Sequence, residues 1–285
     1  MAKKISKQHF TGERAVFQGK DLIFAGCLFD DGESPLKESA DIKLNDCTFG
    51  WKYPLWYSKN IEVEGCLWTE TARAGVWYTE NITLKNTPIN APKNFRRCKN
   101  LTIENCDMPN AQETLWQCEK VTLKNVEVSG NYFAMNCTDI TVDKLILHGD
   151  YGFDGAKNVT IRNSVLETKD AFWNCENVTV IKSKISGEYF GWNSKNVTLI
   201  DCEIESLQGF CYIENLKLVN CRLNNTTLSF EYCKDIDADI VGEIDSVKNP
   251  LSGVIVCDGI KELILEKDKV DVGKTKIIIR GKNEI

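Results

Sequence analysis

The 285-residue sequence lacks the marks of several large protein classes. No apolar run approaches the roughly 18–20 residues that a helix needs to cross a bilayer. The basic N-terminal residues are followed by no apolar core, so they do not resemble a secretory signal, and we expect a cytoplasmic protein. Basic and acidic residues number 35 and 41, and neither sign forms a long run. This balance argues against nucleic acid or an anionic membrane as the main partner.

Residues that hold metals or form catalytic triads are also scarce. The chain has two histidines, His9 and His148, and no Cys-x-x-Cys pair, so we expect no zinc site. Ser, Cys and His show no triad spacing. No pattern demands a cofactor, although carboxylates gathered on one face leave room for calcium.

What the chain does have is a short repeat. In most copies an Asn or Asp is followed by an aliphatic residue, any residue and a second aliphatic residue. The copies begin at Asp21, Asp41, Asn60, Asn81, Asn100, Lys120, Asp139, Asn158, Asn177, Asn196, Asn215 and Asp235. From Asp41 onward they lie 19–21 residues apart. A constant period of this size is typical of a solenoid, in which each repeat covers its neighbours' apolar faces.

The pattern within one repeat predicts strands and corners. With the first Asn or Asp as column zero, columns one and three are aliphatic, as in Val159 and Ile161, which indicates a short strand. Columns zero and five carry residues that tolerate a left-handed backbone, such as Asn158 and Asn163, and these mark corners. We therefore predict an all-β fold, a single-stranded right-handed parallel β-helix of about 12 coils, capped at both ends. We expect one domain over 1–285, with an N-terminal cap at 1–20, regular coils at 21–245 and C-terminal strands at 246–285.

Thirteen cysteines need an explanation in such a protein. Eleven fall in two columns of the repeat: six at column six, as in Cys47, and five at column minus two, as in Cys175. Other coils place mostly small residues at column minus two. We expect ladders of small buried residues with free thiols, as a reducing compartment favours.

The stretch before column zero carries the candidate binding residues. Column minus five is apolar, as in Phe172, and column minus two is small, so a bend between them would turn column minus four outward. Column minus four contains Trp56, Trp77, Arg96, Trp116, Asp154, Trp173 and Trp192, and column minus three contains Tyr57, Tyr78, Arg97, Gln117, Asn174 and Asn193. Aromatic rings stack on sugar faces, while amides, hydroxyls and guanidinium groups supply directional hydrogen bonds. Burial of the tryptophans as a rigidifying stack is the alternative.

Acidic and basic residues on this face are candidates for catalysis. Asp150, Asp154, Asp170 and Glu113 are candidates for the acid and base of glycoside hydrolysis. A lyase would instead use calcium with a basic residue, for which Arg73, Arg96 and Arg97 are candidates. Acidic loop residues are more often simply solvated, so whether the protein is an enzyme stays open.

Several segments resemble a known family. They are residues 8–15 (QHFTGERA), 51–58 (WKYPLWYS), 91–98 (APKNFRRC) and 170–175 (DAFWNC). They resemble an uncharacterised bacterial family filed as a domain of unknown function (DUF3737), which is similar in architecture to the pectate-lyase-like β-helix superfamily. The resemblance implies a fold over nearly the full chain but no activity and no catalytic residue.

Two functions remain open at this point. The first is binding of an oligo- or polysaccharide, with or without processing, on the aromatic and charged face. The second is a non-catalytic scaffold that uses the same face to bind a protein or a second copy of the chain. A concave aromatic groove with carboxylates at its floor would favour the first, and a flat, dry face would favour the second.

Overall fold

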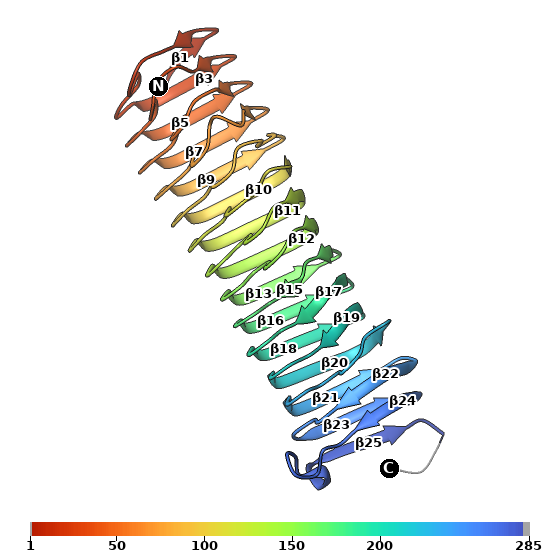
Figure 1. The fold of residues 1–285 in the computed structure, drawn as a ribbon. Helices are drawn as coiled ribbons and strands as arrows, with labels where there is room; N and C mark the ends of the chain where they lie inside the picture. The colour runs from red at the N-terminus through yellow and green to blue at the C-terminus, as the bar shows by residue number, and fades with distance from the viewer. Residues whose placement is uncertain (1, 282–285) are drawn as a thin grey trace. The chain divides into compact units, whose positions relative to one another are not determined.

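The structure is a computed structural model that describes residues 2–281 (Figure 1). The chain divides into two compact units, residues 1–147 (unit 1) and 148–285 (unit 2). Both units are built from short parallel strands in successive coils.

In unit 1 the strands form two rows. The main row pairs in the order β1 (Lys3–Ser6), β3 (Lys20–Ala25), β5 (Ala40–Asn45), β7 (Lys59–Glu64), β9 (Glu80–Lys85), β10 (Lys99–Met108) and β11 (Glu119–Ser129). The second row is β2 (His9–Phe10), β4 (Leu28–Phe29), β6 (Thr48–Phe49) and β8 (Leu67–Trp68). Strand β12 (Thr138–His148) ends at the division between the units.

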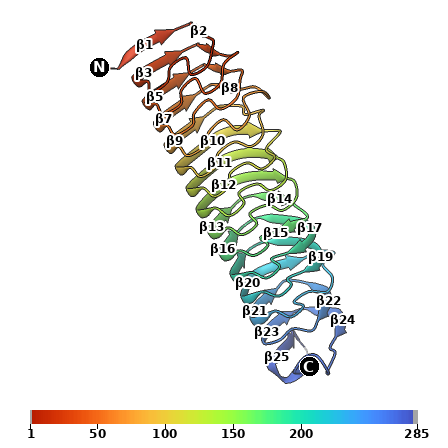
Figure 2. The ribbon, with the colours of Figure 1, turned by 60° about the vertical axis from the view of Figure 1, so that its left-hand side comes forward.

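Unit 2 repeats this arrangement. Its main row is β13 (Lys157–Arg162), β16 (Glu176–Ile181), β18 (Lys195–Ile200), β20 (Glu214–Leu223), β21 (Lys234–Ile240), β23 (Gly253–Cys257) and β25 (Thr275–Ile279). Figure 2 shows further strands beside it, namely β14 (Val165–Glu167), β15 (Asp170–Ala171), β17 (Lys184–Phe190), β19 (Glu203–Gly209), β22 (Glu243–Lys248) and β24 (Gly259–Ile264). A 3-10 turn, η1 (Val272–Lys274), precedes β25.

The predicted fold, a right-handed parallel β-helix, is confirmed, and it has about 15 turns rather than 12. The extra turns contain β1, β23 and β25, where the repeat motif is degenerate. Lys3 and Gly253 lie opposite the aliphatic column-one residues Leu22 and Ile236. Backbone pairing with a neighbouring coil therefore holds these strands although their side chains break the pattern. The segment expected as an N-terminal cap thus contains a coil.

The two predicted corners are confirmed, and a third is present. Asn158 at column zero and Asn163 at column five have φ of 56° and 52°. Column minus three is also left-handed, as at Asn174 with φ of 53°. Asparagine suits these positions because it tolerates the conformation and because its amide can bond to the next coil. The Nδ2 of Asn177 donates to the Oδ1 of Asn158 at 2.9 Å, and Asn196 donates to Asn177 at 2.8 Å.

The third corner is the bend that turns the tryptophans outward. Phe172 at column minus five and Cys175 at column minus two are 0% and 2% exposed, whereas Trp173 between them is 36% exposed. Trp56, Trp77, Trp116 and Trp192 are half-buried. The outward orientation of this column is therefore confirmed.

All thirteen cysteines are free and buried. At column minus two they do more than fill space, because each thiol donates to the backbone carbonyl of column minus five in the preceding coil. The Sγ of Cys98 donates to Val76 at 3.3 Å and that of Cys175 to Phe153 at 2.9 Å. Ser58 makes the equivalent bond to Leu36 at 2.9 Å. This shared hydrogen bond explains why Cys, Ser and Thr interchange in the column.

Within residues 2–281, no helix has the length and apolar character required to cross a membrane.

Candidate functional site

The aromatic column of unit 1 is a closed stack. The indoles of Trp56 and Trp77 are parallel within 7°, with ring centroids 4.9 Å apart. The guanidinium of Arg96 lies between the next two indoles, 4.6 Å from the Trp77 centroid and 4.5 Å from that of Trp116. Most ring faces in this stack are therefore covered by a neighbour.

The indole N–H groups of the same stack are also occupied, whereas the Nε of Arg96 is buried without a hydrogen-bond partner among the described residues. The indole N–H groups of Trp56, Trp77 and Trp116 donate to the backbone oxygens of Ala74, Lys93 and Tyr132 at 2.6, 2.9 and 2.8 Å. Beside them, Tyr57 and Tyr78 stack with centroids 4.7 Å apart. The tryptophan stack of unit 1 thus presents mainly ring edges.

Two of the three basic candidates of unit 1, Arg96 and Arg97, have side-chain partners, whereas Arg73 is exposed near Trp51. An Nη2 of Arg96 lies 3.4 Å from an Oε2 of Glu113, which also lies 3.3 Å from Lys93. The Nε of Arg97 donates to Gln117 at 2.8 Å. Glu113, Arg96 and Arg97 thus belong to unit 1, whereas Asp150, Asp154 and Asp170 belong to unit 2. The acidic and basic residues that we expected on one face therefore divide between the two units.

In unit 2 the aromatic column opens into a pocket of about 170 Å³, lined by Asp170, Trp173, Tyr189 and Trp192. The pairing of β15 with β17 places Asp170 opposite Tyr189. Each of these residues is followed three positions later by a tryptophan. One coil thus supplies Asp170 and Trp173, and the next coil supplies Tyr189 and Trp192 beside them.

The two tryptophans of this pocket differ from those of unit 1. Within the described residues, Trp173 and Trp192 make no ring contact with each other. Trp173 is tilted by 35° against Tyr151, and Trp192 meets Tyr189 edge-on at 80° and packs against Tyr212 with a tilt of 33° and centroids 5.4 Å apart. Neither indole N–H has a hydrogen-bond partner in residues 2–281. Both donors and parts of both rings are therefore available to a ligand.

Asp170 is the polar group of the pocket. It is 8% exposed, and no described residue donates a hydrogen bond to its carboxylate. Burial raises the pKa of Asp170 above its ordinary value, Lys169 opposes this shift, and Glu188, Asp150 and Asp154 add to it. Its oxygens are not among the fully buried, unpaired polar atoms of the described residues, so the carboxylate is accessible from the pocket.

The residues around the pocket form hydrogen bonds and one ion pair. The Nζ of Lys169 lies 3.4 Å from Glu188, and the Oδ1 of Asp150 accepts from the backbone N–H of Lys169 at 3.3 Å. Burial raises the pKa of Asp154, and a hydrogen bond from Asn174 opposes that shift.

The predicted ligand-binding amides at column minus three bond to this surface and to each other. Asn174 donates to Asp154 at 3.5 Å, and Asn193 donates to Asn174 at 2.9 Å. These side-chain amides therefore connect neighbouring coils, and we do not expect them to be the main hydrogen-bond donors to a ligand.

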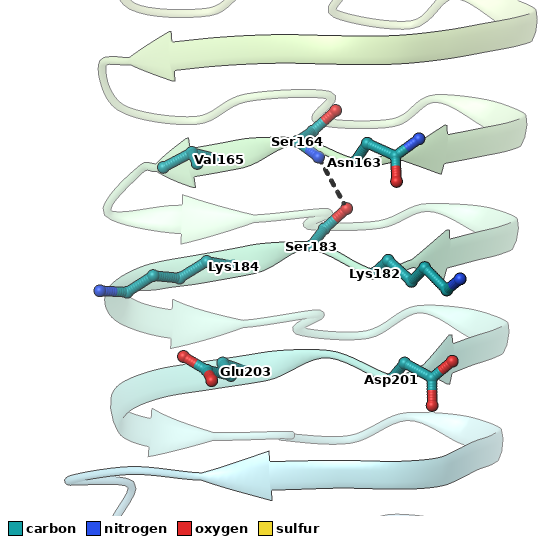
Figure 3. Close-up of a pocket in the computed structure, with 8 residues that line it drawn as sticks. All are labelled: Asn163, Ser164, Val165, Lys182, Ser183, Lys184, Asp201 and Glu203. Atoms are coloured by element: carbon teal, nitrogen blue, oxygen red, sulfur yellow. Dashed lines mark hydrogen bonds between the residues drawn. The ribbon is translucent and has the colours of Figure 1, made fainter.

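A second, wider concavity of unit 2 is a product of the repeat. Figure 3 shows this groove of about 510 Å³, lined by Asn163, Ser164, Val165, Lys182, Ser183, Lys184, Asp201 and Glu203. The backbone N–H of Ser164 donates to the Oγ of Ser183 at 3.1 Å, and both hydroxyls donate to carbonyls of their own coils. Unit 1 has a similar groove at the same columns, around Asn105 and Asn125. Its recurrence and its satisfied floor make it a weaker candidate site.

Sequence reasoning missed Tyr189 as a pocket residue, although a signal was present. Tyr189 and Asp170 occupy the same column, seven residues before Asn196 and Asn177. Reading column minus seven together with column minus four would have placed them beside Trp173 and Trp192. Among the described residues, no three His, Cys, Asp or Glu side chains are grouped as ligands for a metal ion.

Solved structures of several β-helix proteins are similar to this chain at low identity. One is the surface adhesin PfbA of Streptococcus pneumoniae, with 9% identity, 92% of this chain and 89% of that chain covered, and a TM-score of 0.41. A second is a mutant tailspike of E. coli bacteriophage HK620 in complex with a pentasaccharide, with 8% identity, coverage of 97% and 74%, and a TM-score of 0.47. A third is the A-module of the Azotobacter vinelandii mannuronan C-5 epimerase AlgE4, with 11% identity, coverage of 99% and 90%, and a TM-score of 0.32.

Among curated proteins, none matches the sequence. The model of one protein family, by contrast, matches residues 3–278, which is nearly the whole chain. The protein therefore belongs to the family described as "Protein of unknown function (DUF3737)".

Proposed function

We propose that the pocket formed by Asp170, Trp173, Tyr189 and Trp192 binds one ring of an oligosaccharide. The observation that supports this most directly is the contrast between the units. The indole N–H groups of Trp56, Trp77 and Trp116 are bonded to backbone, whereas Trp173 and Trp192 border an open pocket. A stack of tryptophans that only stabilised the coils would not require a pocket between its rings.

The chemistry of the pocket suits a sugar ring. The apolar face of a pyranose stacks on an indole, as aromatic side chains favour flat apolar partners. Sugar hydroxyls can donate to the acceptor-only carboxylate of Asp170 and accept from the indole N–H groups. The volume of about 170 Å³ fits a single ring rather than a long polymer segment.

Processing of the bound sugar is a narrower form of the same proposal. Burial raises the pKa of Asp170 and of Asp154, and a carboxyl group with a raised pKa can act as a general acid. Hydrolysis would pair such an acid with a second carboxylate roughly 5–10 Å away. Asp154 as the acid and Asp170, in its ionised form, as its partner are the assignment to test.

The alternative, a structural role for the aromatic face, is supported in unit 1. There the stacked indoles, with Arg96 between two of them, leave little open ring surface. We propose that Trp56, Trp77 and Trp116 stabilise the coils and that ligand binding is confined to unit 2.

Calorimetric titration with a panel of neutral and charged oligosaccharides tests the proposal. We expect saturable binding by the wild-type protein, and Trp173→Ala should weaken it by at least about fivefold, since loss of a stacking ring costs about 1–3 kcal/mol. The matched control is Trp51→Ala, because Trp51 is similarly exposed at 38% but lies in unit 1. If no oligosaccharide binds, or if both variants lose affinity equally, the proposal is wrong.

A further inference from the structure

The pocket of unit 2 carries an excess of negative charge. The carboxylates of Asp150, Asp154 and Glu188 raise the pKa of Asp170, and the ammonium group of Lys169 lowers it. The ammonium group of Lys169 is already paired with Glu188 at 3.4 Å. Within the described residues, the carboxylate of Asp170 is therefore left without an ion-pair partner of its own.

The walls of the pocket also favour a cation. Trp173, Tyr189 and Trp192 surround the opening beside Asp170. The negative faces of aromatic rings attract an ammonium group, most strongly in the case of tryptophan. An ammonium group brings three donors and no acceptor, which complements a carboxylate that accepts no hydrogen bond from the described residues.

We infer that the ligand is a cationic amino sugar whose free ammonium group sits between Trp173 and Trp192 and bonds to Asp170. This inference rests on the proposed function, since it specifies the class of sugar. A uronic acid would place a like charge beside four carboxylates. A neutral or N-acetylated sugar would leave the charge of Asp170 uncompensated.

The test compares trisaccharides that differ in charge. Glucosamine trimer, its fully N-acetylated form and cellotriose are titrated into the full chain at mildly acidic pH, with choline as a cation that is not a sugar. We expect the free-amine trimer to bind at least about tenfold more tightly than either neutral trimer, equivalent to about 1.4 kcal/mol. Its affinity should also fall as salt is added, because the pocket is open to solvent and salt screens the attraction between the ammonium group and the surrounding carboxylates.

Two matched variants separate the pocket from the general acidity of the chain. Asp170→Asn keeps the shape of the side chain and removes its charge, and should bring the three trimers to similar affinity. Asp201→Asn makes the same chemical change at an exposed corner of unit 2 outside the pocket, and should preserve the preference. If the two variants behave alike, the amine binds by net charge and the inference is overturned.

The remaining outcomes distinguish this inference from the proposed function. Equal binding of all three trimers overturns the cationic preference and leaves sugar binding standing. Binding of choline without any trimer overturns both, because the ligand is then a small ammonium compound. If circular dichroism shows that Asp170→Asn does not fold, the salt dependence of the wild-type protein takes its place as the test. An affinity for the amine trimer that does not change with salt then overturns the inference.

Discussion

The Sγ of Cys118 donates a hydrogen bond to the backbone carbonyl of Phe95, 3.1 Å away in the preceding coil. Both residues are fully buried, so no solvent can replace the bond. The thiol column is therefore part of the hydrogen-bonding of the coils as well as of their packing.

This relationship predicts that Cys118→Ser is tolerated and that Cys118→Val is not. Valine fills the space but removes the thiol donor, and the Phe95 carbonyl keeps only the bond from the backbone N–H of Trp116, so we expect a loss of about 0.5–1.5 kcal/mol. Thermal melting followed by circular dichroism measures the difference. Equal melting temperatures for the two variants would mean that packing alone explains the column.

Arg96 is expected to stabilise unit 1 rather than to act in catalysis. Arg96→Lys keeps a positive charge near Glu113 but loses the planar group stacked between Trp77 and Trp116. We expect a loss of about 1 kcal/mol in stability and unchanged ligand affinity. Arg97→Lys is the control, because Arg97 is exposed and contacts one ring face only, at 5.8 Å. A folded Arg96→Lys protein that no longer binds sugar would restore Arg96 as a site residue.

Trp116 and Trp173 occupy the same column and should respond differently to alanine. Trp116→Ala uncovers Arg96 and removes an indole that donates to Tyr132, so we expect destabilisation of about 2–4 kcal/mol. Trp173→Ala removes a ring that borders open space, and should cost less than about 1 kcal/mol. Chemical denaturation of both variants is the measurement. The reverse order would contradict the division of the column into a ladder and a pocket.

Asp170 should make the stability of the protein depend on pH. Its pKa in the folded protein is raised above its ordinary value of 3.8 by burial, assisted by Glu188, Asp150 and Asp154 and opposed by Lys169. The folded state thus favours the protonated form, so the ionised group destabilises folding at neutral pH, and this penalty disappears as pH falls below the ordinary value.

Asp170→Asn should accordingly melt a few degrees higher than the wild-type protein at neutral pH. The two proteins should converge when the solution is acidified below the ordinary pKa of the carboxyl. Asp201→Asn, at an exposed corner, provides the comparison for a charge change outside the pocket. A wild-type protein that is the more stable of the two at neutral pH would show that Asp170 has a stabilising partner.

The corners of the coil could be read from single positions. Asn158 and Asn163 mark left-handed residues because few side chains adopt that conformation cheaply, and both corners are present. The third corner was inferred only as a bend, because aromatic and basic residues such as Tyr57 and Arg97 occupy the same left-handed column as Asn174. The outermost turns were not counted among the regular coils, because Lys3 and Gly253 lack the aliphatic pattern and are held by backbone pairing.

The sequence by itself determined the period, the strand columns and the outward column of tryptophans, since these follow from local backbone preference and from burial of apolar side chains. Only the tertiary structure decided which of those tryptophans stack. Trp56 and Trp77 lie parallel at 4.9 Å, whereas Trp173 and Trp192 border a pocket beside Asp170. Ring orientation depends on the partners that each coil receives from its neighbours, and one repeat read alone does not contain them.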